Sequence, residues 1–244
     1  MASPAGFHVL GGTCSGLHGH YLPPISSIIP ECTSGLYASS CVTSKYFGHW
    51  LTDGIPTCLL ANEKEILYLW HRKGWSNADQ YLQLIGIAAS KHQYVYFNEL
   101  SFVDDIGMTN NRRQRLQSIN QAILATRSRL NPNRIVYMRR GQTGINRIIL
   151  NEDELVSRLI SEDFCTVDVD QPLEGILDIC AGAKCTVSME GSHCSHLVMS
   201  AAPGAKHFTL NPSDRFNNIF AEYMPAFSGK FATVVVKNKK MDNL

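Results

Sequence analysis

The segment that decides the fold runs from Lys184 to Ala202 and reads KCTVSMEGSHCSHLVMSAA. Residues 184–189 predict a β-strand and residues 191–202 predict a helix, with Gly191 at the turn between them. A strand that passes directly into a helix is typical of a parallel sheet, because parallel neighbours need a crossover between them. The segment therefore predicts an α/β fold.

The same alternation extends outward and fills the chain from about residue 62 to its end. Predicted strands cover residues 65–70, 93–97, 134–139, 165–169, 206–210 and 231–236, and predicted helices cover 76–89, 110–130, 151–163, 172–181 and 214–223. Ser76 is the expected N-cap of the first helix, and Asn151 and Glu154 have the spacing of a capping box. Residues 1–35, rich in Gly, Ser, Pro and His, predict no element. We expect βαβ units and parallel sheets.

Length and breakers predict two lobes. The chain has 244 residues, of which 44% are hydrophobic, enough for one large domain or two small ones. Asn131-Pro132-Asn133 is a strong helix breaker in the middle of the chain. We therefore expect an N-terminal lobe of residues 1–130 and a C-terminal lobe of residues 131–244.

The charge balance disfavours a nucleic-acid partner. The formal net charge is +1, whereas a nucleic-acid binder usually carries a basic stripe. The densest cluster, Arg112, Arg113 and Arg115, is interpreted as a solvated helix start. No apolar run approaches the roughly 20 residues of a membrane span, and residues 1–12 lack the features of a secretory signal. We expect a soluble, cytoplasmic protein, although a lumenal protein without its leader would have the same pattern.

The cysteines and acidic pairs do not predict a metal site. None of the eight cysteines forms a C-x-x-C pair, which disfavours structural zinc. We expect buried reduced thiols, with disulfides as the alternative in an oxidising compartment. The Asp104-Asp105 pair could hold a divalent metal on a nucleotide sugar, but a turn cap explains it equally well. His18 and His20 lack partners at ligand spacing.

The first candidate site is the segment YFGHWLTD, residues 46–53. In open α/β sheets, ligands bind beyond the carboxyl ends of strands, so the corners between strands and helices are the places to search. A helix is expected over about residues 48–61, with an interruption at Pro56. His49 and Asp53 are four residues apart and share a face of this helix. Such a pair suits general base catalysis, and the alternative is a core histidine with an aspartate partner.

The second candidate site consists of arginines. Arg139 and Arg140 end the strand over 134–139, and Arg147 follows a loop that contains glycine. The planar guanidinium group makes paired bonds to phosphate oxygens, so this corner is suited to a diphosphate. The alternative is simple exposed charge.

The third candidate site is Glu190-Gly191-Ser192-His193, at the corner between the strand over 184–189 and the helix over 191–202. Gly191 would let the backbone approach a ligand closely, and the start of the next helix attracts phosphate. The alternative is an ordinary corner with a capping serine. Cys194 and His196 could suggest a thiol nucleophile, but residues two apart on a helix face away from each other.

Taken in order, these corners resemble glycosyltransferase family 61, over roughly residues 40–235. The segments that carry the resemblance are Tyr46–Asp53, Tyr137–Arg140, Arg147–Glu152 and Glu190–Cys194. The last of these departs from the commonest form of the family, His-Gly-Ala-Gly-Leu, because it has Glu in place of His and lacks the second Gly.

The resemblance implies a GT-B-like fold, in which two Rossmann-like lobes with parallel sheets face each other across a cleft. Residues 1–130 would be a reduced acceptor-side lobe, and residues 131–244 would bind the nucleotide sugar. It also implies an inverting transfer from a nucleotide sugar, commonly UDP-linked, to a hydroxyl of a glycan or glycoprotein. No metal or other cofactor is expected, and the oligomeric state stays open.

The resemblance also implies roles for individual residues. Asp53 would be the base, with His49 as second choice. Arg139, Arg140 and Arg147 would bind the donor, and Arg140 and Arg147 would neutralise the leaving diphosphate. Gly191, Ser192 and His193 would bind the diphosphate, and Glu190 would contact hydroxyls of the ribose or donor sugar. The main alternative is a non-catalytic module of the same fold that binds a nucleotide or sugar. A dinucleotide-dependent enzyme is disfavoured because no Gly-x-Gly-x-x-Gly corner occurs.

Overall fold

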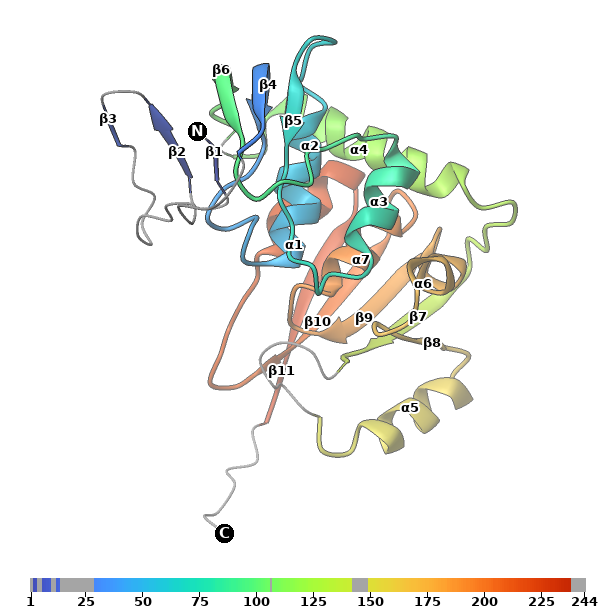
Figure 1. Cartoon of the computed structure of the whole chain (residues 1–244). Coiled ribbons are helices and arrows are strands. Elements are labelled where there is room, and N and C mark those ends of the chain that lie inside the picture. Colours follow the sequence, from blue (N-terminus) through green and yellow to red (C-terminus); the bar gives the residue numbers. More distant parts are fainter. Residues whose placement is uncertain are drawn as a thin grey trace. The chain divides into compact units, whose positions relative to one another are not determined.

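The chain folds into two compact units, residues Met1–Gly107 and Met108–Leu244. The structure, a computed structural model, describes residues 2–3, 6–9, 12–13, 29–105, 107–141 and 149–237. Figure 1 labels the strands and the helices α1 to α7.

Unit 1 is built on a three-stranded parallel sheet in the order β5-β4-β6. Its strands are β4 (Glu31–Tyr37), β5 (Ile66–Tyr68) and β6 (Tyr96–Phe102), and helix α3 (Ala78–Ile85) lies between β5 and β6 in the chain. A small antiparallel sheet comprises β1 (Ala2–Ser3), β2 (Gly6–Val9) and β3 (Gly12–Thr13). The buried hydrophobic cluster of the parallel sheet consists of Tyr37, Tyr68, Val95 and Phe97.

The central strand of this sheet, β4, has almost no sequence signature. It reads ECTSGLY and has a glycine in its interior, which usually weakens a strand. The aromatic ring of Phe97 on β6 packs so closely over Gly35 that a Cβ atom there would overlap it. The glycine is therefore required by a neighbour 62 positions away in numbering, and local sequence could not indicate it.

Unit 2 is built on a five-stranded sheet that is parallel throughout, in the order β11-β10-β9-β7-β8. Its strands are β7 (Ile135–Arg139), β8 (Cys165–Asp168), β9 (Cys185–Met189), β10 (Lys206–Pro212) and β11 (Lys230–Val236). The chain steps from β7 out to β8 and then returns to the other side of β7. This is the 2-1-3-4-5 order of a doubly wound sheet, with its switch point between β7 and β9. The predicted α/β class with parallel sheets is confirmed.

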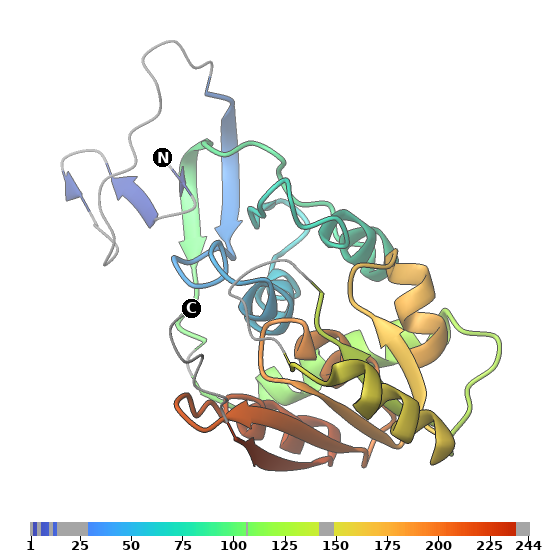
Figure 2. The ribbon, with the colours of Figure 1, turned by 90° about the horizontal axis from the view of Figure 1, so that it is seen from below.

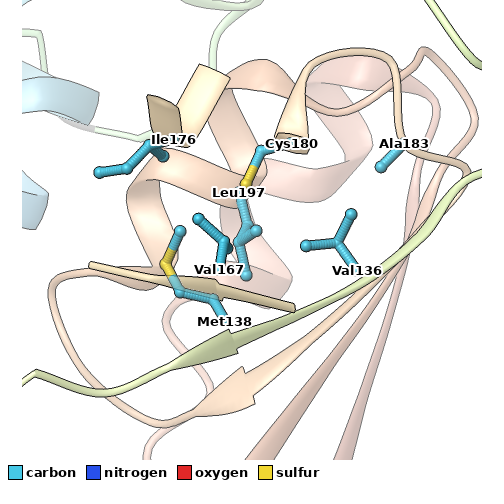
Figure 3. Close-up of a cluster of buried hydrophobic side chains, with 7 residues drawn as sticks. All are labelled: Val136, Met138, Val167, Ile176, Cys180, Ala183 and Leu197. Carbon is cyan, nitrogen blue, oxygen red and sulfur yellow. The ribbon is translucent and has the colours of Figure 1, made fainter. Parts of the chain in front are cut away.

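Helices cover both faces of the unit 2 sheet. They are α4 (Asn110–Ala125), α5 (Glu152–Ser161), α6 (Leu173–Cys180), α7 (Cys194–Ser200), α8 (Phe220–Tyr223) and the 3₁₀ helix η2 (Met224–Phe227). Figures 1 and 2 show α5 on one face of the sheet and α6 and α7 on the opposite face. Between the sheet and α6 and α7 lies a core of seven buried residues (Figure 3): Val136, Met138, Val167, Ile176, Cys180, Ala183 and Leu197.

Helix α4 packs within unit 2, although it precedes the Asn131-Pro132-Asn133 break. It contacts α7 and η2, and the Asn120 amide donates to the carbonyl oxygens of Met199 (2.8 Å) and Ala201 (3.1 Å) at the end of α7. The interpretation of its arginines as a solvated cluster is wrong for two of the three. Arg112 and Arg115 are only 6% and 9% exposed, and the Arg112 guanidinium lies 5.9 Å from the centre of the Tyr223 ring.

Two local predictions about helices are also wrong. Asn151 precedes α5, but its side chain makes no capping hydrogen bond, and Glu154 instead pairs with Arg158 at 2.8 Å. The helix predicted from residue 214 begins only at Phe220. Upstream of it, the Asn217 side chain accepts a hydrogen bond from the Ile219 amide at 3.0 Å, and such local bonds compete with helix formation.

The cysteines of the described residues form no disulfide. Seven are free thiols: Cys32, Cys41, Cys58, Cys165, Cys180, Cys185 and Cys194. Three of them, Cys58, Cys180 and Cys194, are buried as expected for small apolar residues, whereas Cys165 is exposed. Cys14 lies outside the described residues.

Candidate functional site

The second and third candidate sites meet at the switch point of unit 2. The register of β7 against β9 places Met138 opposite Ser188, so Arg140 and Glu190 follow side by side at the carboxyl edge. The Arg140 guanidinium donates a hydrogen bond from Nη1 to the Glu190 carbonyl oxygen at 2.8 Å. We call Arg140, Glu190, Gly191 and His193 the switch-point cluster. Doubly wound sheets bind their ligands at this edge.

Gly191 allows the cluster to be this tight. Its φ of +152° is rare for residues with a side chain, and a Cβ atom there would overlap the Arg140 guanidinium and the His193 ring. Both the backbone conformation and the space therefore require glycine at this position.

Glu190 is a buried carboxylate that several side chains hold. It is 3% exposed; its Oε1 accepts a hydrogen bond from Asn217 Nδ2 at 2.7 Å, and its Oε2 lies 3.6 Å from Arg215 Nε. Asn211 Nδ2, at the end of β10, donates to the Asn217 carbonyl oxygen at 2.9 Å. Sequence reasoning missed Asn211, Arg215 and Asn217, the last two of which fall in the helix that was expected from residue 214. Their position at the end of a strand of the sheet, or shortly after it, was the signal that could have identified them.

The turn after Gly191 is ordered by its own hydrogen bonds. The amides of Cys194, Ser195 and His196 donate to the carbonyls of Gly191, Ser192 and His193 at 3.0, 3.2 and 3.1 Å. His193 is 8% exposed and precedes α7, and Ser192 is half-buried. These bonds hold the Gly191–His193 turn directly above the end of β9.

Cys194 does not have the properties of a nucleophile. Its thiol donates to the Met189 carbonyl oxygen at 3.2 Å and lies 2.9 Å from Ser188 Oγ. Burial raises the pKa of Cys194 to about 12, so the reactive thiolate is scarce near neutral pH.

Arg139 is engaged by carboxylates. Its Nη2 lies 2.6 Å from Asp153 Oδ1, and its Nε lies 3.8 Å from Glu152 Oε2 and 3.6 Å from Asp168 Oδ1. The hydrogen bond to Asp153 is the main reason that the pKa of Arg139 is raised. The structure therefore brings Arg140, rather than Arg139, to the switch-point cluster. Arg147 lies outside the described residues.

The first candidate site lies in unit 1, on the helix that follows β4. His49 Nδ1 and Asp53 Oδ2 are 2.6 Å apart, and the two side chains are 27% and 26% exposed. A hydrogen bond this short directs the imidazole and leaves Nε2 as its second polar atom. The predicted pairing of His49 with Asp53 on one helix face is confirmed. The pair is partly accessible, unlike a fully buried core histidine.

The helix that carries this pair continues through Pro56 because it contains a π-helical segment just before the proline. It runs as α1 (Phe47–His49), the π-helix η1 (Trp50–Gly54) and α2 (Ile55–Cys58), and the Ile55 amide donates to the Trp50 carbonyl oxygen. The expected interruption at Pro56 is therefore wrong. Proline lacks the amide that would bond to residue 52, and a π turn accommodates this loss. Such turns are frequent at functional sites.

No metal site is evident in the part of the chain that the structure describes. Those residues contain no group of three or more His, Cys, Asp or Glu side chains that could hold an ion. Asp104 and Asp105 belong to this part, whereas His18 and His20 do not. Within the same residues, no helix is both long and apolar enough to cross a membrane.

Fold and site together define an α/β protein of the doubly wound class, with an arginine, a carboxylate and a glycine turn at its switch point. The family model described as Glycosyltransferase 61 matches residues 47–207, about two thirds of the chain, and the chain therefore belongs to glycosyltransferase family 61. The matched span contains His49, Asp53 and the whole switch-point cluster. The resemblance seen in the sequence is confirmed. No curated protein matches the chain.

Proposed function

We propose that the protein is an inverting glycosyltransferase that moves a sugar from a UDP-sugar donor to a hydroxyl of a glycan or glycoprotein. Membership of family 61 supports the transferase class. The proposal includes the GT-B-like arrangement of lobes that the family resemblance implies, with the donor bound by unit 2.

The observation that carries the proposal is the hydrogen bond from Arg140 to the Glu190 carbonyl oxygen, across the switch point. It ties a guanidinium group to a glycine turn at the edge where doubly wound sheets bind nucleotides. In the proposed reaction, Arg140 stabilises the negative charge that develops on the departing diphosphate, a task that arginine or lysine side chains or a metal ion can perform. Glu190 accepts hydrogen bonds from hydroxyls of the donor.

The proposed base belongs to the His49–Asp53 pair. The 2.6 Å contact at Nδ1 favours His49 as the group that removes the proton, through Nε2, with Asp53 orienting and charging the ring. This reverses the order of roles expected from the sequence. The acceptor oxygen loses its proton to His49 and bonds to the anomeric carbon, while the bond from that carbon to the diphosphate oxygen breaks on the opposite face. Inversion follows from this single displacement.

Calorimetric titration with UDP, with and without EDTA, tests the donor site. We expect binding that survives EDTA and weakens by about tenfold or more in Arg140→Ala, because hydrogen bonds to charged groups contribute about 1.5–3 kcal/mol. If wild-type protein binds no nucleotide, the donor site and the enzyme assignment both fail, and an interaction module becomes the better interpretation.

Asp53→Asn tests the catalytic pair. We expect transfer to fall by about 10²-fold or more, with UDP affinity unchanged, because general base catalysis contributes 10²–10⁴-fold. Asp79→Asn is a matched control, since Asp79 also pairs with a histidine of unit 1, with its Oδ1 3.4 Å from His71 Nε2. Equal activity of the two variants would remove the pair from the proposed mechanism.

A further inference from the structure

Arg215 is a half-exposed cation at the same edge of the sheet as the switch-point cluster. It lies three residues beyond the end of β10, where the carboxyl ends of the parallel strands meet. Its side chain is 49% exposed, and its contact with Glu190 is long, 3.6 Å from Nε to Oε2. Within the described residues, its guanidinium makes no hydrogen bond that meets ordinary distance limits.

The surroundings of Arg215 differ from those of the neighbouring arginine on β7. Arg139 has three carboxylates within 4 Å, so its charge is neutralised locally. Arg215 has one carboxylate, and that carboxylate is already fixed by the amide of Asn217 at 2.7 Å. Four of its five N–H donors lie on the two terminal nitrogens, beyond the Nε contact.

Arg140 and Arg215 both contact Glu190, one at its main chain and the other at its side chain. Arg140 bonds to the main-chain oxygen of Glu190, and Arg215 approaches its carboxylate. The two guanidinium groups therefore flank Glu190 at the edge where the donor is proposed to bind. A diphosphate carries more than one negative charge, and two guanidinium groups match it better than one.

We propose that Arg215 is a second binding residue for the diphosphate of the donor, acting beside Arg140. This inference rests on the proposed donor site. Asn211 and Asn217 are positioning residues: the 2.9 Å bond from Asn211 to the Asn217 carbonyl and the 2.7 Å bond from Asn217 to Glu190 hold the carboxylate that orients Arg215. Arg215 binds through its terminal nitrogens while Nε keeps its contact with Glu190.

The test compares UDP with uridine, because the difference between their affinities isolates the diphosphate. We expect Arg215→Ala to weaken UDP binding by about tenfold while leaving uridine binding unchanged, and Arg215→Lys to lie between it and wild type. Lys206→Ala is the matched control, since it removes one exposed positive charge from the start of β10, at the opposite edge of the sheet. It should bind both ligands as wild type does.

Three outcomes would overturn the assignment. If Arg215→Ala binds UDP as tightly as wild type while Arg140→Ala does not, the donor site stands and Arg215 has no part in it. If Arg215→Ala loses affinity for uridine and UDP equally, the residue acts through the shape of the site and not on the phosphates. If wild-type protein binds neither ligand, the proposed function itself fails, and the role of Arg215 with it.

Discussion

Replacing Gly191 with alanine should damage both the stability of unit 2 and the donor site. The new Cβ atom would force a residue with a side chain into φ of +152° and would overlap the Arg140 guanidinium. The backbone strain costs about 1–3 kcal/mol. Displacing Arg140 from the Glu190 carbonyl oxygen costs about 1.5–3 kcal/mol more. Alanine recovers about 0.4–1 kcal/mol by restricting the unfolded chain, so we expect a net loss of about 2–5 kcal/mol.

Two control substitutions at other glycines separate steric overlap from backbone strain. Gly204 has φ of +81° but open space around its Cβ position, so Gly204→Ala adds backbone strain of about 1–2 kcal/mol without steric overlap. Gly74 also has open space and is not among the glycines with positive φ, so Gly74→Ala should keep only the gain of about 0.4–1 kcal/mol from the restricted unfolded chain. The predicted order of stability is therefore Gly74→Ala, then Gly204→Ala, then Gly191→Ala.

Urea unfolding followed by far-UV circular dichroism is the appropriate assay. All three tryptophans, Trp50, Trp70 and Trp75, belong to unit 1, so tryptophan fluorescence would report the wrong unit. UDP titration of the same variants measures the donor site. If Gly191→Ala unfolds like Gly74→Ala and binds UDP like wild type, the steric argument for the switch-point cluster is incorrect.

Three further predictions concern buried polar groups of unit 2. Burial lowers the pKa of His196 and of His207 from 6.5 to about 3. Between these pH values the unfolded chain binds more protons, so the free energy of unfolding should fall as pH drops from 6.5 towards 3, by up to ~1.4 kcal/mol per pH unit for each histidine. His207→Gln should reduce this slope in urea unfolding at a series of pH values, and an unchanged slope would contradict the assignment. Cys194 should resist alkylation in native protein at pH 8 while the exposed Cys165 reacts; peptide mapping by mass spectrometry would show the reverse order if Cys194 were an accessible nucleophile. Asn120→Ala should destabilise the protein by about 1–3 kcal/mol, because it removes two hydrogen bonds at the end of α7, and wild-type stability in urea would refute this role.

Local sequence was informative where the conformation of an element depends mainly on its own residues. The sequence predicts both ends of every strand of the unit 2 sheet to within two residues, because the apolar runs are bounded by helices and breakers. His49 and Asp53 were paired correctly, since four residues of helix bring two side chains together whatever the rest of the fold does. The carboxyl-edge positions of Arg140 and Glu190 followed from the same strand-to-helix pattern.

Local sequence was misleading where a distant partner decides the conformation. The sequence pattern predicts no strand at β4, because its Gly35 is explained only by distant neighbours, the Phe97 ring and the Ile66 carbonyl oxygen. The sequence pattern predicts helix in the segment before α8, whereas the Asn217 side chain makes hydrogen bonds with the Ile219 amide and the Glu190 carboxylate. The charge pattern predicts Arg112 and Arg115 on the surface, whereas the packing of α4 within unit 2 buries them.

The sequence by itself determined the α/β class, the family and the His49–Asp53 pair, because these depend on periodicity, on motif order and on spacing within one helix. Tertiary structure alone decided the strand order, and with it the switch point between β7 and β9. That order brings Arg140 beside the main-chain oxygen of Glu190, 50 positions further along the chain. It also brings Arg215, which follows the end of a third strand, beside the Glu190 carboxylate. Hydrogen bonds between strands set these distances, and no local pattern encodes which strands become neighbours.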